Sequence, residues 1–210
     1  LYHQIESYDP VTGVYNAWVR IPSLSNSSPT TIYMAYGNAS ISTDPSSTGV
    51  WISSYKGVWH LNTDAVDATS TGNDGAESNT SDISGIVGGG KSFNGSSSYI
   101  QFNPLSGMTA NDENQTLSVW ARYTSVPGDN RNFFSIQNPG SAVQIGFRGG
   151  NAVAWKWGGT LLADAGFAPS TDTWHYFVYT FDGVTHNLYI DGVDVGSSTT
   201  APQVLVPTEG

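Results

Sequence analysis

The residues from Asp67 to Gly75 are the part of the chain whose types and spacing best suit a metal ion. This stretch, Asp-Ala-Thr-Ser-Thr-Gly-Asn-Asp-Gly, combines carboxylate and amide side chains with glycines that leave backbone carbonyls free to turn inward. Calcium takes about six to eight oxygen ligands in flexible geometry, so it is the metal that such a loop would suit. The alternative is a loop held by hydrogen bonds from its own Asx turns, with its carboxylates in solvent.

Two tryptophans form a second candidate site. Trp155 and Trp157 are two residues apart and therefore lie on one face of a predicted strand. Flat rings can pack against the apolar face of a sugar while nearby polar side chains orient its hydroxyls. The polar residues that could do so are Asp129, Asn130, Arg148 and Lys156. The alternative is that the tryptophans, including Trp120 and Trp174, fill the core of a β-sandwich.

Catalytic groups are not arranged for a recognisable reaction. The chain has four glutamates, Glu6, Glu77, Glu113 and Glu209, and none lies in the pattern that holds two carboxylates about 5 Å apart in a retaining glycosidase. It contains no Gly-x-Ser-x-Gly elbow and no phosphate-binding loop. His60 and His175 are interpreted as hydrogen-bonded structural residues. The sequence therefore predicts a protein that is not an enzyme.

Composition excludes several other classes of function. With 7 Lys and Arg against 17 Asp and Glu, the net charge of -10 argues against binding to nucleic acid, which requires basic residues at the phosphates. No window approaches the roughly 20 apolar residues of a membrane span, so no membrane insertion is expected. The absence of cysteine excludes disulfides and thiolate metal sites.

The elements that must position these residues are short strands separated by turn residues. The first 55 residues predict three strands, at 2–7, 14–21 and 31–36. A sheet of three short strands is marginal alone, so it should pack on the following domain or pair with strands upstream.

The rest of the chain predicts a larger β-sandwich. In 116–123, Leu117 and Val119 alternate with Trp120 and Arg122, as in a strand with one face in the core. Residues 175–181 are apolar on both faces, which predicts a strand in the middle of a covered sheet. Asp191-Gly192, between apolar runs, predicts a tight hairpin turn.

Several motifs give the chain a resemblance to known families. The segment from Gly57 onward resembles the laminin-G-like, concanavalin A-type jelly-roll family, and residues 1–55 resemble part of an uncharacterised domain family that often precedes it in secreted prokaryotic proteins. The motifs of the first are 57–62, 67–75, 90–95, 98–100, 117–121 and the hairpin at 181–195, and those of the second are 5–9, 17–24 and 31–38. After Val195 the chain has fifteen residues, so the jelly roll either lacks its closing strands or completes its edge in another way.

The resemblance implies an all-β fold, a concanavalin A-like jelly-roll β-sandwich at 56–210 with the small β unit of 1–55 packed on it. It also implies a structural Ca2+ ion bound by Asp67, Asn73, Asp74 and the Gly72 carbonyl. The function it implies is a non-catalytic carbohydrate-binding or adhesion module of a larger extracellular or cell-surface protein, with a glycan as partner. Two alternatives remain: a structural subunit of a filament or surface layer that assembles through exposed sheet edges, and an accessory domain of a polysaccharide hydrolase or lyase.

Overall fold

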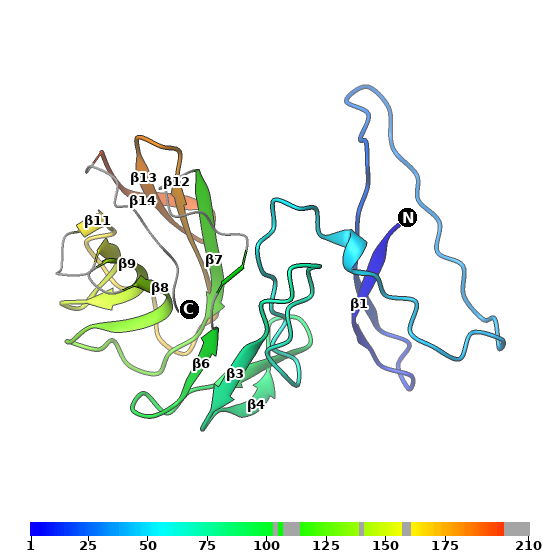
Figure 1. Cartoon of the computed structure of the whole chain (residues 1–210), viewed down its shortest axis with the longest axis horizontal. Helices are drawn as coiled ribbons and strands as arrows, with labels where there is room; N and C mark the ends of the chain where they lie inside the picture. The colour runs from blue at the N-terminus through cyan, green and yellow to red at the C-terminus, as the bar shows by residue number, and fades with distance from the viewer. Residues whose placement is uncertain (103–104, 107–113, 139–140, 157–160, 200–210) are drawn as a thin grey trace. The chain divides into compact units, whose positions relative to one another are not determined.

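The computed structural model describes residues 1–102, 105–106, 114–138, 141–156 and 161–199 (Figure 1). The chain divides into two compact units: unit 1 comprises residues 1–74 and 81–92, and unit 2 comprises residues 75–80 and 93–210. Within the described residues the regular structure is β-strand, apart from one 3-10 turn, Thr48–Val50. No helix in this part of the chain has the length and apolar character to span a membrane. The prediction of an all-β protein is therefore confirmed.

Unit 1 contains two small antiparallel sheets. Strand β1 (His3–Tyr8) pairs with β2 (Tyr15–Val19), with a bulge between Ile5 and Ser7, and β4 (Ser81–Ser84) pairs with β5 (Gly89–Ser92). The turn between β1 and β2 is held by Asp9, whose Oδ1 accepts the backbone N–H of Val11 at 2.8 Å. The first two strands expected from the sequence are thus present, with slightly different ends.

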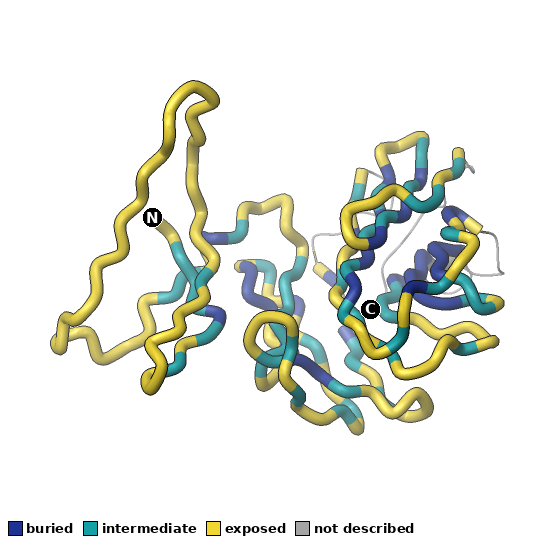
Figure 2. Tube along the Cα trace, turned by 180° about the vertical axis from the view of Figure 1, so that it is seen from behind, coloured by how far each residue is buried: buried dark blue, intermediate teal, exposed yellow. Residues whose placement is uncertain are grey.

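The third strand expected in this region, at 31–36, does not form. Residues 30–38 have no regular structure and are exposed along their whole length, with Tyr33 92% exposed (Figure 2). A strand needs a partner for its backbone N–H and C=O groups, and no described segment pairs with this one. The expectation was wrong because β-propensity alone does not supply that partner.

Unit 2 is built on two four-stranded antiparallel sheets. In spatial order, one sheet is β14 (Val193–Ser198), β13 (His186–Ile190), β12 (His175–Phe181) and β7 (Gln115–Ala121). The other is β11 (Leu161–Asp164), β10 (Asn151–Lys156), β9 (Ser141–Arg148) and β8 (Arg131–Asn138). A further pair joins β3 (Gly75–Ser78) to β6 (Tyr99–Phe102). The predicted strand at 175–181 is confirmed, including its interior position in a sheet.

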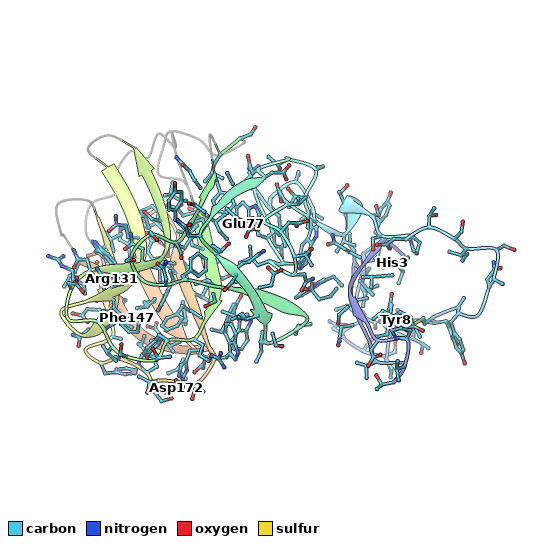
Figure 3. The ribbon with its side chains drawn as sticks, turned by 90° about the horizontal axis from the view of Figure 1, so that it is seen from below. His3, Tyr8, Glu77, Arg131, Phe147 and Asp172 are labelled. Atoms are coloured by element: carbon cyan, nitrogen blue, oxygen red, sulfur yellow. The ribbon has the colours of Figure 1, made fainter. Side chains whose placement is uncertain are left out.

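The core of unit 2 contains alternate residues of β12 and consecutive residues of β9 and β10, at 143–147 and 152–155, which are buried on both faces of their sheet. Along β12 every second residue is buried, and the residues between them are half-buried on the outer face. Phe147 on β9 contacts Tyr123 and Phe133 edge-on, with ring centroids 4.5 and 5.2 Å away (Figure 3). The fully buried side chains of this core include Ile136, Val143, Ile145, Phe147, Leu162, Phe177, Tyr179, Phe181 and Leu188.

The hairpin between β13 and β14 has the turn that Asp191-Gly192 predicts. Both residues have positive φ, 52° and 82°, which is the requirement of a tight two-residue turn and is met most easily by Asp or Asn followed by Gly. The Asp191 carboxylate also accepts the backbone N–H of Tyr176 at 2.9 Å, which ties the turn to the start of β12. The two strands it joins therefore have a fixed register.

The outer edge of β14 lies against β11 of the other sheet. A Cβ atom placed on Gly196 would lie 2.4 Å from the backbone oxygen of Asp164, so only glycine fits there without a shift. Ser198 Oγ donates a hydrogen bond of 2.6 Å to the backbone oxygen of Leu162. From Gly196 to Ser198 the last described strand therefore closes one side of the sandwich and does not present an open edge.

Candidate functional site

The loop predicted to hold calcium is closed around the Asp67 carboxylate. Its Oδ1 accepts the N–H groups of Val58 and Thr69 at 3.0 and 2.9 Å, and its Oδ2 accepts Thr69 Oγ1 and the Asn73 N–H at 2.8 and 2.9 Å. Burial alone would raise the pKa of Asp67, but these hydrogen bonds outweigh it and lower the pKa. Asp67 therefore acts as an anionic acceptor for the loop backbone.

Of the other predicted ligands, Asn73 and Asp74 also take part in the hydrogen bonds of the loop, while Gly72 has a positive φ of 73° there. Asp74 Oδ1 accepts the Asp67 N–H at 2.8 Å, and Asn73 donates its amide N–H to the Lys56 carbonyl at 2.6 Å. The four positions at which Asp67 could accept are filled by N–H and O–H donors, whose hydrogens occupy the space a cation would need. Among the described residues no group of three or more His, Asp or Glu side chains could hold a metal. The loop as folded does not fit a calcium site. It is held by hydrogen bonds, as the alternative expected, but the Asp67 carboxylate is buried and not in solvent.

The tryptophan pair predicted to bind sugar is only partly described. Trp155 is 2% exposed and belongs to the core, so no face of its ring is open to a ligand, which is a correction to its predicted role. Trp157 lies outside the described residues, and the side chain of Lys156 is not described.

The polar residues expected beside that pair gather at another end of the sheet. Asp129 and Asn130 precede β8, where Asp129 forms a 2.9 Å ion pair with Arg131. Arg148 ends β9 and lies opposite Asn151, whereas Trp155 lies opposite Gln144, four residues further along and so about 13 Å away. The structure therefore separates these groups from Trp155.

A different aromatic group is exposed on the outer face of the β14-β13-β12-β7 sheet. Trp120 of β7 lies directly opposite Tyr176 of β12, and the two rings stack with centroids 5.0 Å apart and planes at 29°. Trp120 is 45% exposed, so the ring that the core interpretation placed inside is at the surface. The alternation at 116–123 places Trp120 on the face of the strand opposite to that of the buried Leu117. This alternation is the sequence signal that identifies Trp120 as an outward-facing residue.

Arg122 and Trp174 extend this group by one row. Arg122 is two residues beyond Trp120, and its guanidinium carbon lies 5.5 Å from the centre of the Trp174 ring, which is a cation–π contact. In the other direction along the two strands, Ser118 of β7 lies opposite Val178 of β12, and this pair continues the same face. We call Trp120, Tyr176, Arg122 and Trp174 the aromatic face. It combines flat apolar surface with a planar set of N–H donors.

A Ser–His–Asp arrangement occurs beside the turn between β13 and β14, which contains Asp191. His175 Nδ1 lies 2.7 Å from Asp191 Oδ2, and its Nε2 lies 3.1 Å from Ser170 Oγ. The same Nε2 is also 3.0 Å from the Ser170 carbonyl oxygen, which can only accept. His175 therefore links the turn at Asp191 to the segment that contains Ser170.

Unit 1 contains a second group of polar and aromatic side chains around Glu6. The Glu6 side chain is 4% exposed, and its carboxylate faces Trp18 Nε1 at 2.6 Å, His60 Nδ1 at 2.5 Å and Asn62 Nδ2 at 3.0 Å. Gln4 Oε1 accepts Trp51 Nε1 at 2.7 Å and lies 3.1 Å from His60 Nε2. These contacts join β1 to the segment that contains His60, in agreement with the structural interpretation of that histidine. We call this group the Glu6 cluster.

Comparisons with known proteins agree with both resemblances. A model described as a domain of unknown function, DUF2341, matches residues 1–75, and the laminin-G family model of the concanavalin A-like lectin/glucanases superfamily matches residues 94–210. The search of curated proteins gave no match.

Five solved chains are similar to this one. One of them is domain 4 of AbnA, a GH43 extracellular arabinanase from Geobacillus stearothermophilus, in complex with arabinotriose, and it shares 21% identity with a TM-score of 0.59 over 70% of this chain and 76% of that one. At this identity the similarity shows a common fold. Because the laminin-G model covers more than half of the residues, the chain belongs to the concanavalin A-like lectin/glucanases superfamily.

Proposed function

We propose that the chain is a non-catalytic carbohydrate-binding module, and that it binds sugar on the aromatic face of unit 2. The observation that carries the proposal is the Trp120 ring, which is half-exposed yet held in place by stacking on Tyr176. A ring that is already ordered loses little conformational entropy when it meets a ligand, and it offers the flat apolar surface on which a sugar packs. The non-catalytic part rests on the sequence, in which the four glutamates do not form a catalytic pair.

The similar arabinanase domain indicates a first ligand to try. That domain was solved with arabinotriose, so short neutral oligosaccharides of pentoses and hexoses are the natural probes. We further propose the same setting as that enzyme, an extracellular protein of which this chain is one part.

The test is a titration of the intact chain with arabinotriose, xylotriose and cellotriose, followed by tryptophan fluorescence and calorimetry. At least one should bind, and Trp120→Ala should weaken it by about tenfold or more, the usual effect of losing a central aromatic contact. Phe167→Ala is the matched control, because Phe167 is 46% exposed in the same unit but outside the aromatic face. Binding that Trp120→Ala leaves unchanged would place the site elsewhere, and no binding to any sugar would reject the proposal.

A second candidate is a subunit that assembles with copies of itself by strand addition. The observation that favours it is the segment at 31–36, which has the composition of a strand but no partner among the described residues. Sedimentation at increasing concentration tests this directly. Assembly that Ile32→Lys abolishes would support it, and a monomer at all concentrations would reject it.

A further inference from the structure

We infer that the aromatic face selects sugars carrying a carboxylate, namely an isolated uronic acid within an otherwise neutral oligosaccharide, and that Arg122 recognises the carboxylate. This inference rests on the proposed function and makes its ligand class specific. It starts from the charge of the chain, in which Lys and Arg number only seven and the net charge is -10. Because cations are so few in this chain, the position of one beside exposed aromatic rings indicates a specific role.

Arg122 differs from other described basic residues in that its contact is with a ring, whereas Arg20 and Lys56 donate to the backbone carbonyls of Gly49 and Ser53. Arg131 pairs with Asp129 at 2.9 Å, and Lys91 pairs with Asp82 at 2.6 Å. Arg122 is exposed, its contact is with the Trp174 ring, and no carboxylate among the described residues forms an ion pair with it. Its charge is therefore not neutralised within the described part of the chain.

The cation–π contact leaves the hydrogen-bonding groups of Arg122 available. A contact with a ring does not take up all five N–H donors of the guanidinium, which lie in the plane of the group. Two of those donors match the two oxygens of a carboxylate in a bidentate pair, which is stronger than a hydrogen bond to a neutral hydroxyl. The contact with Trp174 also limits the motion of the side chain, so less entropy is lost on binding.

The spacing lets one sugar use both Trp120 and Arg122. Arg122 follows the last residue of β7 and is two residues from Trp120, so their Cα atoms are at most about 7 Å apart. A sugar ring stacked on Trp120 would therefore hold a carboxylate substituent within reach of the long Arg122 side chain. The acidic residue Asp172 is near this end of β7, since its backbone N–H donates to the Tyr123 carbonyl at 2.8 Å, but its carboxylate forms no ion pair with Arg122.

The net charge decides between a single uronate and a polyuronate. A chain of -10 repels a polyanion over its whole length, as the sequence argument against nucleic acid also states. One carboxylate at Arg122 interacts at contact distance, while the remaining charges are screened beyond about 8 Å at physiological salt. The ligand class that fits is thus a neutral glycan with a single acidic residue.

The experiment compares matched ligands that differ in one group. Xylo-oligosaccharides and arabinogalactan oligosaccharides that bear one glucuronic acid are titrated beside the same molecules with the carboxyl reduced to an alcohol. The chain should bind at least one acidic form about tenfold more tightly than its reduced form. Arg122→Gln should remove that preference, so that the variant binds the acidic and reduced forms equally, and Arg122→Lys should retain part of the preference because it keeps the charge but not the planar donors.

The outcomes separate the two proposals. The role of Arg122 would be overturned if the reduced forms bound as tightly as the acidic forms or more tightly, or if only neutral sugars bound. Either result would leave the carbohydrate-binding function intact. No binding of any oligosaccharide would overturn the proposed function itself. If Arg122→Gln still prefers the acidic form over the reduced form, a residue other than Arg122 recognises the carboxylate. An unchanged melting temperature in Arg122→Gln serves as the folding control, since a surface substitution shifts the free energy of unfolding by only about 0.5 kcal/mol.

Discussion

The Glu6 cluster and the aromatic face both display a tryptophan of nearly equal exposure, yet their polar atoms are used differently. Trp18 is 44% exposed and Trp120 is 45% exposed. The Trp18 indole N–H donates to the buried Glu6 carboxylate, whereas Trp120 makes no hydrogen bond from its indole to the described residues. Exposure therefore does not distinguish a structural ring from one that we propose binds a ligand. The distinction is whether its hydrogen-bonding group is already satisfied.

The largest expected effect of this difference is on the stability of unit 1. Glu6→Ala should destabilise that unit by about 3 kcal/mol, because it leaves His60, Trp18 and Asn62 without their common acceptor in a buried position. Urea denaturation followed by tryptophan fluorescence measures the loss. Sugar binding by Trp120 should be unaffected under conditions in which unit 2 remains folded.

Two variants check that the loss comes from the carboxylate. Glu6→Gln keeps one acceptor oxygen and should cost less than Glu6→Ala. Asp64→Ala removes an exposed carboxylate of the same unit, whose hydrogen bond is to the nearby Val66 N–H, and should cost no more than about 0.5 kcal/mol. If Glu6→Ala proves as mild as Asp64→Ala, the Glu6 cluster is not a structural centre.

A smaller effect is expected from acid. Burial would raise the pKa of Glu6, but hydrogen bonds from His60 and Trp18 and the charge of His60 outweigh it and hold the pKa below 4.5. A lowered folded-state pKa means that the carboxylate stabilises the fold above the unfolded value, and that this contribution is lost as pH falls through the folded pKa. The free energy of unfolding of unit 1 should therefore drop below about pH 4.5.

Comparison with Glu6→Gln isolates the contribution of Glu6 to the pH dependence of the free energy of unfolding, because the variant has no carboxylate to protonate at that position. Denaturation curves of the two proteins between about pH 6 and pH 3 should converge as pH falls. Asp191→Asn offers the parallel test in unit 2: burial would raise the pKa of Asp191, and the hydrogen bonds from His175 and the Tyr176 backbone outweigh it and lower the pKa. Parallel curves at constant separation would show that Glu6 does not contribute to the acid sensitivity.

The smallest expected effect is that of calcium. Because the Asp67 carboxylate already accepts four hydrogen bonds, the melting temperature should be the same in 2 mM calcium, an approximate extracellular level, and in EDTA. Had the loop bound calcium with an affinity of about 0.1 mM, the gain would be near 1.8 kcal/mol, or several degrees. A rise of that size would restore the predicted metal site and show that the loop rearranges to bind it.

Much of the fold could be predicted because its signals are local. Asp191-Gly192 specified its turn through the two positive φ angles, and the alternation at 116–123 identified the inward and outward faces of β7. The segment at 31–36 was predicted wrongly because a strand exists only with a partner, which lies beyond local propensity. The domain boundary at 55/56 and the packing of the small unit on the sandwich stay predictions.

The candidate site could be predicted only in part, for a related reason. The chemistry of the Asp67 loop was visible in the sequence, but the direction of its oxygen atoms was not, and hydrogen bonds from Val58, Thr69 and Asn73 decide that they serve the backbone. The Trp155 ring had the right type for a sugar but the wrong environment, because it is buried.

The sequence alone thus determined the class of protein: an acidic, cysteine-free, all-β chain with the motifs of a jelly roll and no arrangement of catalytic groups. These follow from composition, period-two alternation and turn chemistry, which act over a few residues. The tertiary structure decided which rings and charges remain available. Residues distant in the sequence, such as Trp120 and Tyr176 or Glu6 and His60, meet only when strands pair and sheets pack, and that meeting determines whether a polar atom is used within the protein or left for a ligand.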